Sequence, residues 1–426
     1  MFSFIKISFP AVIIILFNYS LSAQDMKYTR SILDTLCSKT MFGRGYVKEG
    51  DKKAAEYIRN EFKKTRLSFF SKDGFQKLSY PVNTFPGKME ASINGKKLIP
   101  GVDFFIQAKS NTCKGTFRIV YYNVNTIKFV DSLKWFKQQN FSDKFILVDR
   151  SGTKNKDTLE ILNLMRTNPM KARGLIFIDK KATWNVSTKK ENFVVVSLSE
   201  NLMKEKIQTI SIDVETKYIE KYETQNVIAF LEGKSKPDSF IVFTAHYDHL
   251  GGIGDSLFIP GANDNASGIS MLLNLASYYS KNKPEYSIAF MAFTGEEAGL
   301  LGSSYFAENP LFPLNKIKIL FNLDLVGTGD DGMMLVNGAV FKKEFEQIKN
   351  LNDKKNYLPK VNMRGEAANS DHYPFYKNGV ICFFIYTQGG ISEYHNPFDK
   401  AETLPLTKYK ELFSLLTDYV EMLQAK

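Results

Sequence analysis

Apolar runs of strand length alternate with a helical pattern in the second half of the chain. Near-continuous apolar stretches at 240–245, 286–293, 317–325 and 379–386 are typical of strands that are covered on both faces. Between the first two lies SGISMLLNLASYYS, in which apolar residues recur at helical spacing. Strand, helix and strand in this order predict an α/β fold, with a mixed, mostly parallel sheet flanked by helices.

The first half of the chain carries two further patterns. Within residues 24–95, the segment KKAAEYIRNEFKK places its apolar residues at three- and four-residue steps, which predicts an amphipathic helix. Residues 96–220 instead consist of short β-rich runs joined by polar connections. We therefore expect a β-rich domain at 96–220, inserted into a domain that is formed by residues 24–95 and 221–426.

Residues 1–23 have the three parts of a secretory signal peptide. Lys6 precedes the apolar run PAVIIILF, and small residues follow before Gln24. The apolar run is much shorter than a membrane span. We expect cleavage after Ala23 and a periplasmic or secreted protein without a membrane span after cleavage. A lipid anchor is not indicated, because no cysteine lies near the cleavage site.

Composition and charge narrow the function classes. The hydrophobic content of 44% and charged content of 24% are those of a globular protein. The formal net charge is +11, but much of the excess is dispersed lysine without an aromatic-interleaved basic stripe, so we do not expect nucleic acid as a partner. The three cysteines permit at most one disulfide bond. The oligomeric state is not indicated.

All four histidines lie in the second half of the chain, each near an acidic residue, and such clustering indicates a metal site. Several of these polar residues directly follow the predicted strands. His246 and Asp248 follow the first strand, Glu296 and Glu297 follow the second, and Asp324 closes the third. Ligands of open α/β sheets bind at the carboxyl ends of the strands, so we expect these side chains to meet there.

Two loops complete the candidate ligand set. Asp264 lies in GANDNASG before the predicted helix, and His395 lies in YHNPFD after the last strand. Taken singly, each candidate has an ordinary explanation as a buried histidine, a helix-capping acid or an exposed acidic pair. Together, two histidines and three carboxylates supply mixed nitrogen and oxygen ligands for zinc: His246, Asp264, Glu297, Asp324 and His395. They suffice for two ions if one carboxylate bridges.

Six ordered motifs of this region resemble the co-catalytic zinc aminopeptidases of the bacterial leucyl aminopeptidase type: AHYDHLG, PGANDNASG, TGEEAGLLGS, NLDLVG, NSDHYPF and YHNPFD. The same superfamily includes glutamate carboxypeptidases, glutaminyl cyclases and the transferrin receptor ectodomain. The resemblance implies the zinc exopeptidase fold, two zinc ions and peptide substrates. More weakly, residues 96–220 are similar to the protease-associated domain that many members insert.

The resemblance also implies how the ligands are shared. His246 and Asp324 match the ligands of one zinc ion, and Glu297 and His395 match those of the other. Asp264 matches the carboxylate that bridges both ions.

Further residues match other roles in the family. Glu296 matches the general base, Asp248 the carboxylate that orients His246, and Tyr394 the residue that helps to stabilise the oxyanion. The pocket-lining motif is matched by Ser370, Asp371 and His372. Near the last ligand this chain has Asn396 and Lys400 where the family often has His-Thr-Pro and Asp-Thr, so the pocket wall there differs.

The resemblance favours an aminopeptidase, and three alternatives stay open. A glutaminyl cyclase uses a single zinc ion and tends to have tryptophan where this chain has Tyr394. A receptor-like binding module would have lost the metal ligands, all of which are present. A carboxypeptidase needs a cation for the substrate carboxylate, and Arg364 is the candidate because it is the only arginine after Arg173; an exposed arginine is the simpler interpretation.

Overall fold

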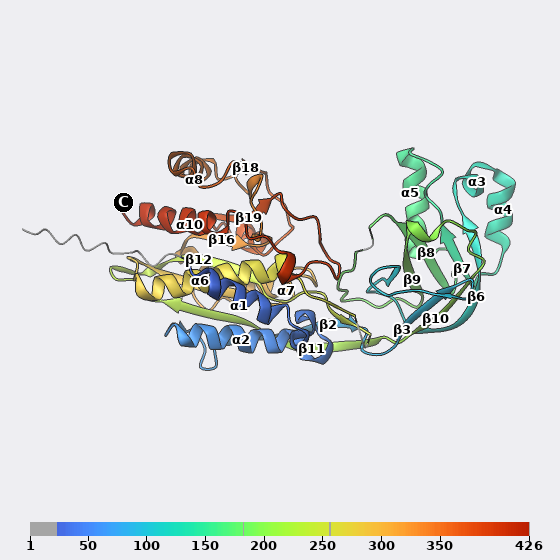
Figure 1. Ribbon diagram of the computed structural model, residues 1–426, viewed down its shortest axis with the longest axis horizontal. Helices are drawn as coiled ribbons and strands as arrows, with labels where there is room; N and C mark the ends of the chain where they lie inside the picture. Colours follow the sequence, from blue (N-terminus) through green and yellow to red (C-terminus); the bar gives the residue numbers. More distant parts are fainter. Residues whose placement is uncertain (1–23, 182, 255–256, 426) are drawn as a thin grey trace, which may run out of the picture.

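The computed structural model describes residues 24–181, 183–254 and 257–425 (Figure 1). The signal peptide expected at residues 1–23 lies outside this part of the chain. Within it, no helix is both long and apolar enough to cross a membrane. All three cysteines, Cys37, Cys113 and Cys382, are free thiols.

In the described part of the chain, a nine-stranded sheet has the order β1-β11-β15-β12-β16-β19-β17-β18, with β2 paired to β11. Its four middle strands, β15, β12, β16 and β19, are parallel, whereas β11 and β17 run antiparallel beside them. This confirms the predicted mixed sheet, with parallel strands at its centre. The strands are β1 (Ser68–Phe69), β2 (Phe75–Thr84), β11 (Lys217–Leu231), β12 (Lys236–His246), β15 (Tyr286–Phe293), β16 (Ile317–Leu323), β17 (Gly332–Val336), β18 (Val361–Met363) and β19 (Cys382–Gln388).

Helices cover both faces of this sheet, which explains why its middle strands are apolar on both sides (Figure 1). Ile241 and Phe243 of β12 belong to a core shared with α1, α2, α6, α8 and α10. The alternate residue Val242 packs in a second cluster with Phe306 of α7 and Phe375 of α9. The helices are α1 (Met26–Leu36), α2 (Gly50–Lys64), α6 (Ser267–Lys281), α7 (Leu301–Glu308), α8 (Lys342–Lys355), α9 (His372–Lys377) and α10 (Tyr409–Gln424).

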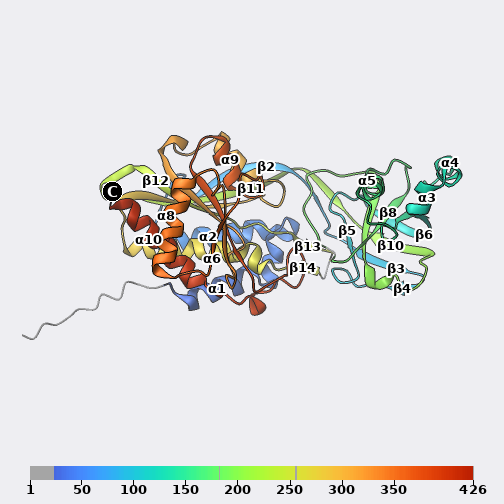
Figure 2. The same ribbon diagram turned by 90° about the horizontal axis from the view of Figure 1, so that it is seen from above.

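A second domain lies beside the first along the long axis of the molecule (Figures 1 and 2). It contains an eight-stranded sheet of order β4-β3-β10-β6-β7-β8-β9-β5, in which β6 to β9 are parallel. Its strands are β3 (Met89–Ile93), β4 (Lys96–Lys97), β5 (Phe104–Ile106), β6 (Cys113–Tyr122), β7 (Lys144–Val148), β8 (Gly174–Asp179), β9 (Val194–Ser199) and β10 (Thr209–Val214). The helices of this domain are α3 (Val124–Lys128), α4 (Val130–Gln138) and α5 (Lys156–Leu164).

We call this second domain the insert, and the remainder of the described chain the α/β domain. The strands of the insert lie between residues 89 and 214, whereas the sequence pattern predicted the domain at 96–220. The bounds differ because β3 already pairs in the sheet of the insert, and because β11 continues without interruption from residue 217 into the first sheet.

A short hairpin joins the two domains. Its strands, β13 (Gly251–Ile253) and β14 (Leu257–Ile259), pair antiparallel in the segment after β12. Leu250, Ile253 and Ile259 are buried in the core of the insert rather than in that of the α/β domain. The hairpin therefore fixes the insert against the segment that connects His246 to Asp264.

Candidate metal centre

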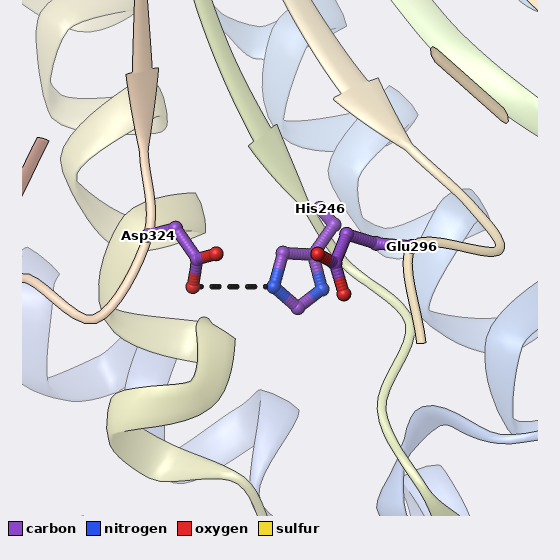
Figure 3. A group of neighbouring side chains, drawn as sticks. All are labelled: His246, Glu296 and Asp324. Carbon is purple, nitrogen blue, oxygen red and sulfur yellow. Dashed lines mark hydrogen bonds and ion pairs between the residues drawn. The ribbon is translucent and has the colours of Figure 1, made fainter. Parts of the chain in front are cut away.

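Three neighbouring parallel strands deliver side chains to one edge of the sheet. His246 is the last residue of β12, Asp324 follows β16 directly, and Glu296 and Glu297 follow β15. Figure 3 shows the carboxylates of Asp324 and Glu296 pointing toward the imidazole of His246. The structure thus brings these residues together at the carboxyl ends of the strands, as their sequence positions indicated.

The five candidate ligands form two groups that share one carboxylate. Nε2 of His246 lies 3.3 Å from Oδ1 of Asp324 and 3.4 Å from Oδ1 of Asp264. Nε2 of His395 lies 3.0 Å from Oδ2 of Asp264 and 3.2 Å from Oε2 of Glu297. The two oxygens of Asp264 therefore face different histidines.

These distances fit metal coordination. Donors that surround a zinc ion tetrahedrally at about 2.0–2.1 Å lie roughly 3.3 Å from one another. The donor separations in both groups fall close to that value, between 3.0 and 3.4 Å. His246, Asp264 and Asp324 are also buried, so the donors are withdrawn from solvent. Each group can hold one zinc ion, with Asp264 reaching both.

His249 joins this cluster, although sequence reasoning gave it no role. Glu296 can also group with His246 and Asp324, and His249 with Asp264 and Glu297. However, Nδ1 of His249 lies 2.7 Å from Oε1 of Glu297, the oxygen that faces away from His395. We therefore interpret His249 as the residue that orients Glu297, as a hydrogen-bond partner commonly does for a metal-binding carboxylate.

Asp248 connects the two histidine-bearing groups through the backbone. Its carboxylate accepts hydrogen bonds from the N–H groups of Glu296 at 3.2 Å and Glu297 at 3.3 Å. The same carboxylate lies 3.7 Å from Nδ1 of His246, which contacts the backbone carbonyl of Asp248 at 3.1 Å. Asp248 is thus placed to fix the ring of His246 and the loop of both glutamates together.

The motif of residues 370–372 contacts the site through Ser370. Oγ of Ser370 donates to Oδ2 of Asp324 at 2.7 Å and accepts from Nδ2 of Asn322 at 2.7 Å. Asp371 and His372 are buried, and within the described residues their side-chain nitrogen and oxygen atoms have no hydrogen-bond partner. Burial raises the pKa of Asp371 to about 7 and lowers the pKa of His372 to about 4. Ser370 thus supports the candidate ligand Asp324, and burial disfavours the charged form of His372.

Tyr394 and Arg364 are both exposed to solvent. The ring of Tyr394 stacks on the imidazole of His395, with centroids 3.8 Å apart, while 46% of the tyrosine is exposed. Arg364 is exposed, and its guanidinium donates to the hydroxyl of Tyr386 at 3.4 Å. Tyr394 therefore borders the centre, whereas Arg364 is not the buried cation that a carboxylate clamp requires.

The adjacent glutamates have opposite electrostatic environments. Burial raises the pKa of Glu296 well above its ordinary value; His246 opposes this shift, and Asp324 and Glu297 add to it. Burial also disfavours ionisation of Glu297, but His395 and His249 outweigh it and hold the pKa of Glu297 well below its ordinary value. Glu296 is thus the better proton acceptor for a base, and Glu297 the better permanent carboxylate for a ligand.

Arg44 is a second residue that sequence reasoning missed. Its side chain is completely buried, and its guanidinium donates to backbone carbonyls on both ligand loops and on the end of α1. The acceptors are Tyr247 at 2.8 Å, Leu36 at 3.1 Å, Pro260 at 2.6 Å, Gly261 at 2.8 Å and Asp264 at 3.2 Å. One arginine therefore ties the loop of His246 to the loop of Asp264.

Asp399 fixes the same loop from the other side. Its buried carboxylate accepts from the N–H of Asn263 at 2.9 Å and from the N–H of Asp264 at 3.1 Å. Asn396, one of the departures from the family pattern, is buried and donates to Glu393 at 2.7 Å. The YHNPFD motif held the signal for both residues, but their partners could not be read from it.

Comparison with known proteins finds a similar peptidase family and similar solved structures. Residues 226–420 match the model described as peptidase family M28. Aminopeptidase YwaD of Bacillus subtilis is 28% identical over 255 residues, which are 55% of this chain and 52% of the relative, so the chain matches only about half of that protein's length. The structure of BSAP, a zinc aminopeptidase from Bacillus subtilis, is similar with a TM-score of 0.67 at 20% identity, over 94% of each chain.

A second solved structure has the same fold. The aminopeptidase from Aneurinibacillus sp. strain AM-1 is similar with a TM-score of 0.63 at 19% identity, over 95% of each chain. At these identities the solved structures show a common fold. Both matches cover nearly the whole length of the chain.

The contacts of Arg44 predict a large loss of stability on substitution. Lysine keeps the charge but has three N–H donors, so Arg44→Lys leaves buried carbonyls unpaired at about 1–3 kcal/mol each. We expect the free energy of unfolding to fall by roughly 2–5 kcal/mol. Urea denaturation measures it, with the exposed Arg66→Lys as the matched control. Equal midpoints for Arg44→Lys and the wild type would contradict this role.

Proposed function

We propose that the chain is a member of peptidase family M28, whose model matches residues 226–420, and that it is an exported metallo-aminopeptidase that uses two zinc ions. The observation that carries this proposal is the position of Asp264, whose two oxygens face His246 and His395 separately. A site for one metal ion does not need the two oxygens of one carboxylate to face different histidines. The names of the relatives, aminopeptidase and zinc aminopeptidase, support the same assignment.

The residues at the centre can be given distinct tasks. When bound, two zinc ions polarise a peptide carbonyl and acidify a water molecule. Glu296 accepts the proton of that water and returns it to the leaving amine, for which its raised pKa is suited. Asp248 and His249 hold the adjacent side chains in place, and the hydroxyl of Tyr394 donates to the oxyanion that develops on the carbonyl oxygen.

The site favours an aminopeptidase over the three alternatives. Arg364 is exposed, so this arginine does not supply the buried cation that a carboxypeptidase needs. All five ligands and the base converge, which a receptor-like binding module would not require. Tyr394 precedes His395 in the sequence, at the position where glutaminyl cyclases commonly have tryptophan.

A substrate panel tests the proposed reaction. We expect the purified protein to release the first residue of aminoacyl amides and of peptides that have a free amine. N-acetylated peptides should resist cleavage. Equal turnover of free and acetylated peptides would exclude an aminopeptidase, and cyclisation of N-terminal glutamine without hydrolysis would indicate a cyclase. If residues 1–23 direct export, the exported protein used in this assay should begin at Gln24.

Substitution of the two adjacent glutamates separates the base from the ligand. Because Glu296 moves a proton but need not hold a metal ion, Glu296→Gln should lower kcat by roughly 10²–10⁴ fold with nearly unchanged zinc content. Glu297→Gln should instead lose zinc from one site and regain part of its activity when zinc is added. Steady-state kinetics and metal analysis measure both effects.

The matched control is Glu308→Gln, at the exposed end of α7. It should alter neither kcat nor zinc content. If Glu296→Gln kept activity within a few fold of the wild type, or if the two variants exchanged their phenotypes, the assignment of base and ligand would be wrong.

A further inference from the structure

The last ligand, His395, lies on a loop rather than on a strand of the sheet. The loop follows β19 and carries both Tyr394 and His395. His395 has φ of +52°, in the left-handed region that residues other than glycine seldom adopt. Such a conformation persists when the surroundings hold it in place. The residues that contact this loop therefore influence the position of the ligand.

Two of these contacts come from the insert. The backbone N–H of Trp184 donates to the carbonyl oxygen of His395 at 3.0 Å. Nζ of Lys181 donates to the carbonyl oxygen of Ser392 and lies 3.5 Å from Oε2 of Glu393. The insert thus contacts the loop both at the ligand itself and just before it.

Trp184 is firmly anchored within the insert. Only 4% of the residue is exposed, and its indole N–H donates to the carbonyl oxygen of Ile106 at 2.6 Å. The ring meets Phe85 edge to face, with centroids 5.7 Å apart. The hydrogen bond to His395 is therefore made from a rigid part of the insert, not from a free surface chain.

Within the loop, Glu393 contacts both Lys181 and a residue next to the ligand. Oε2 of Glu393 accepts a hydrogen bond from Nδ2 of Asn396 at 2.7 Å, and Oδ1 of Asn396 accepts from the N–H of Phe398 at 2.9 Å. These bonds close the turn around His395. Lys181 is thus connected through one carboxylate to the residues on both sides of the ligand.

The two metal-binding groups differ in their dependence on the insert. His246 and Asp324 are fixed by β12 and β16 in the middle of the sheet. His395 has no strand to hold it and receives a direct hydrogen bond from the insert instead. The hairpin of β13 and β14 in turn holds the insert in position, because Leu250, Ile253 and Ile259 are part of its core.

We propose that the insert is a structural part of the metal centre: Lys181 and Trp184 are positioning residues for His395, and they set the affinity of the zinc site formed by Glu297 and His395. This inference rests on the proposed two-zinc function. It gives the insert a role in loading the enzyme with metal, because any change that loosens its contact with the loop weakens the second site first.

Zinc titration of the full-length mature protein tests this inference. The protein is stripped of metal and titrated with zinc by calorimetry, in the presence of a competing chelator. Lys181→Ala should weaken the weaker of the two sites by about 10-fold or more and leave the other within about 2-fold, because changes to groups that orient a ligand cost about 10–100-fold in metal affinity. Trp184→Phe, which loses the bond to Ile106, should act in the same direction.

The neighbouring Lys180→Ala is the matched control, because Lys180 is exposed and makes no ion pair within the described residues. Urea denaturation of the metal-free variants distinguishes positioning from general damage: Lys181→Ala should unfold at the wild-type midpoint. Glu393→Gln should reproduce the zinc phenotype, and its combination with Lys181→Ala should be less than additive.

The outcomes separate this inference from the proposed function. Two zinc sites with wild-type affinities in Lys181→Ala and Trp184→Phe would overturn the role of the insert and leave the two-zinc proposal standing. Equal weakening of both sites would also overturn it, since the effect would not be directed at His395. A single zinc site in the wild type would overturn both proposals.

Discussion

The carboxylate of Asp264, held between two histidines, is the feature on which the rest of the centre depends. All four polar groups of this residue are fixed. Its side-chain oxygens face His246 and His395, its N–H is bound by Asp399, and its carbonyl oxygen is bound by Arg44. If Asp264 turned away, the two groups of ligands would no longer share a member.

Holding several carboxylates in a buried site is costly unless cations or hydrogen-bond donors oppose them. Here histidines and backbone N–H groups oppose them. The two adjacent glutamates, however, have different surroundings. Glu297 lies between His249 and His395, so its ionised form is stabilised, whereas Glu296 is buried beside other carboxylates, so its proton is held more tightly. A difference in environment thus suits two adjacent glutamates to different tasks.

The sequence predicted those parts of the structure that local patterns determine. The apolar runs became β12, β15, β16 and β19, and the polar residues that end them meet at one edge of the sheet. Arg44 and Asp399 were missed because their partners are backbone groups distant in sequence, as with the contact from Arg44 to Asp264. Nothing in the composition of residues 181–184 indicated a contact with the loop of His395.

In the proposed function, two zinc ions bind on either side of Asp264. Anomalous X-ray diffraction from zinc-loaded crystals, recorded at the zinc absorption edge, locates each ion. We predict two anomalous peaks roughly 3.5–4 Å apart, one beside His246 and Asp324 and the other beside Glu297 and His395, with Asp264 in contact with both. A single peak, or a second peak away from Asp264, would contradict the account.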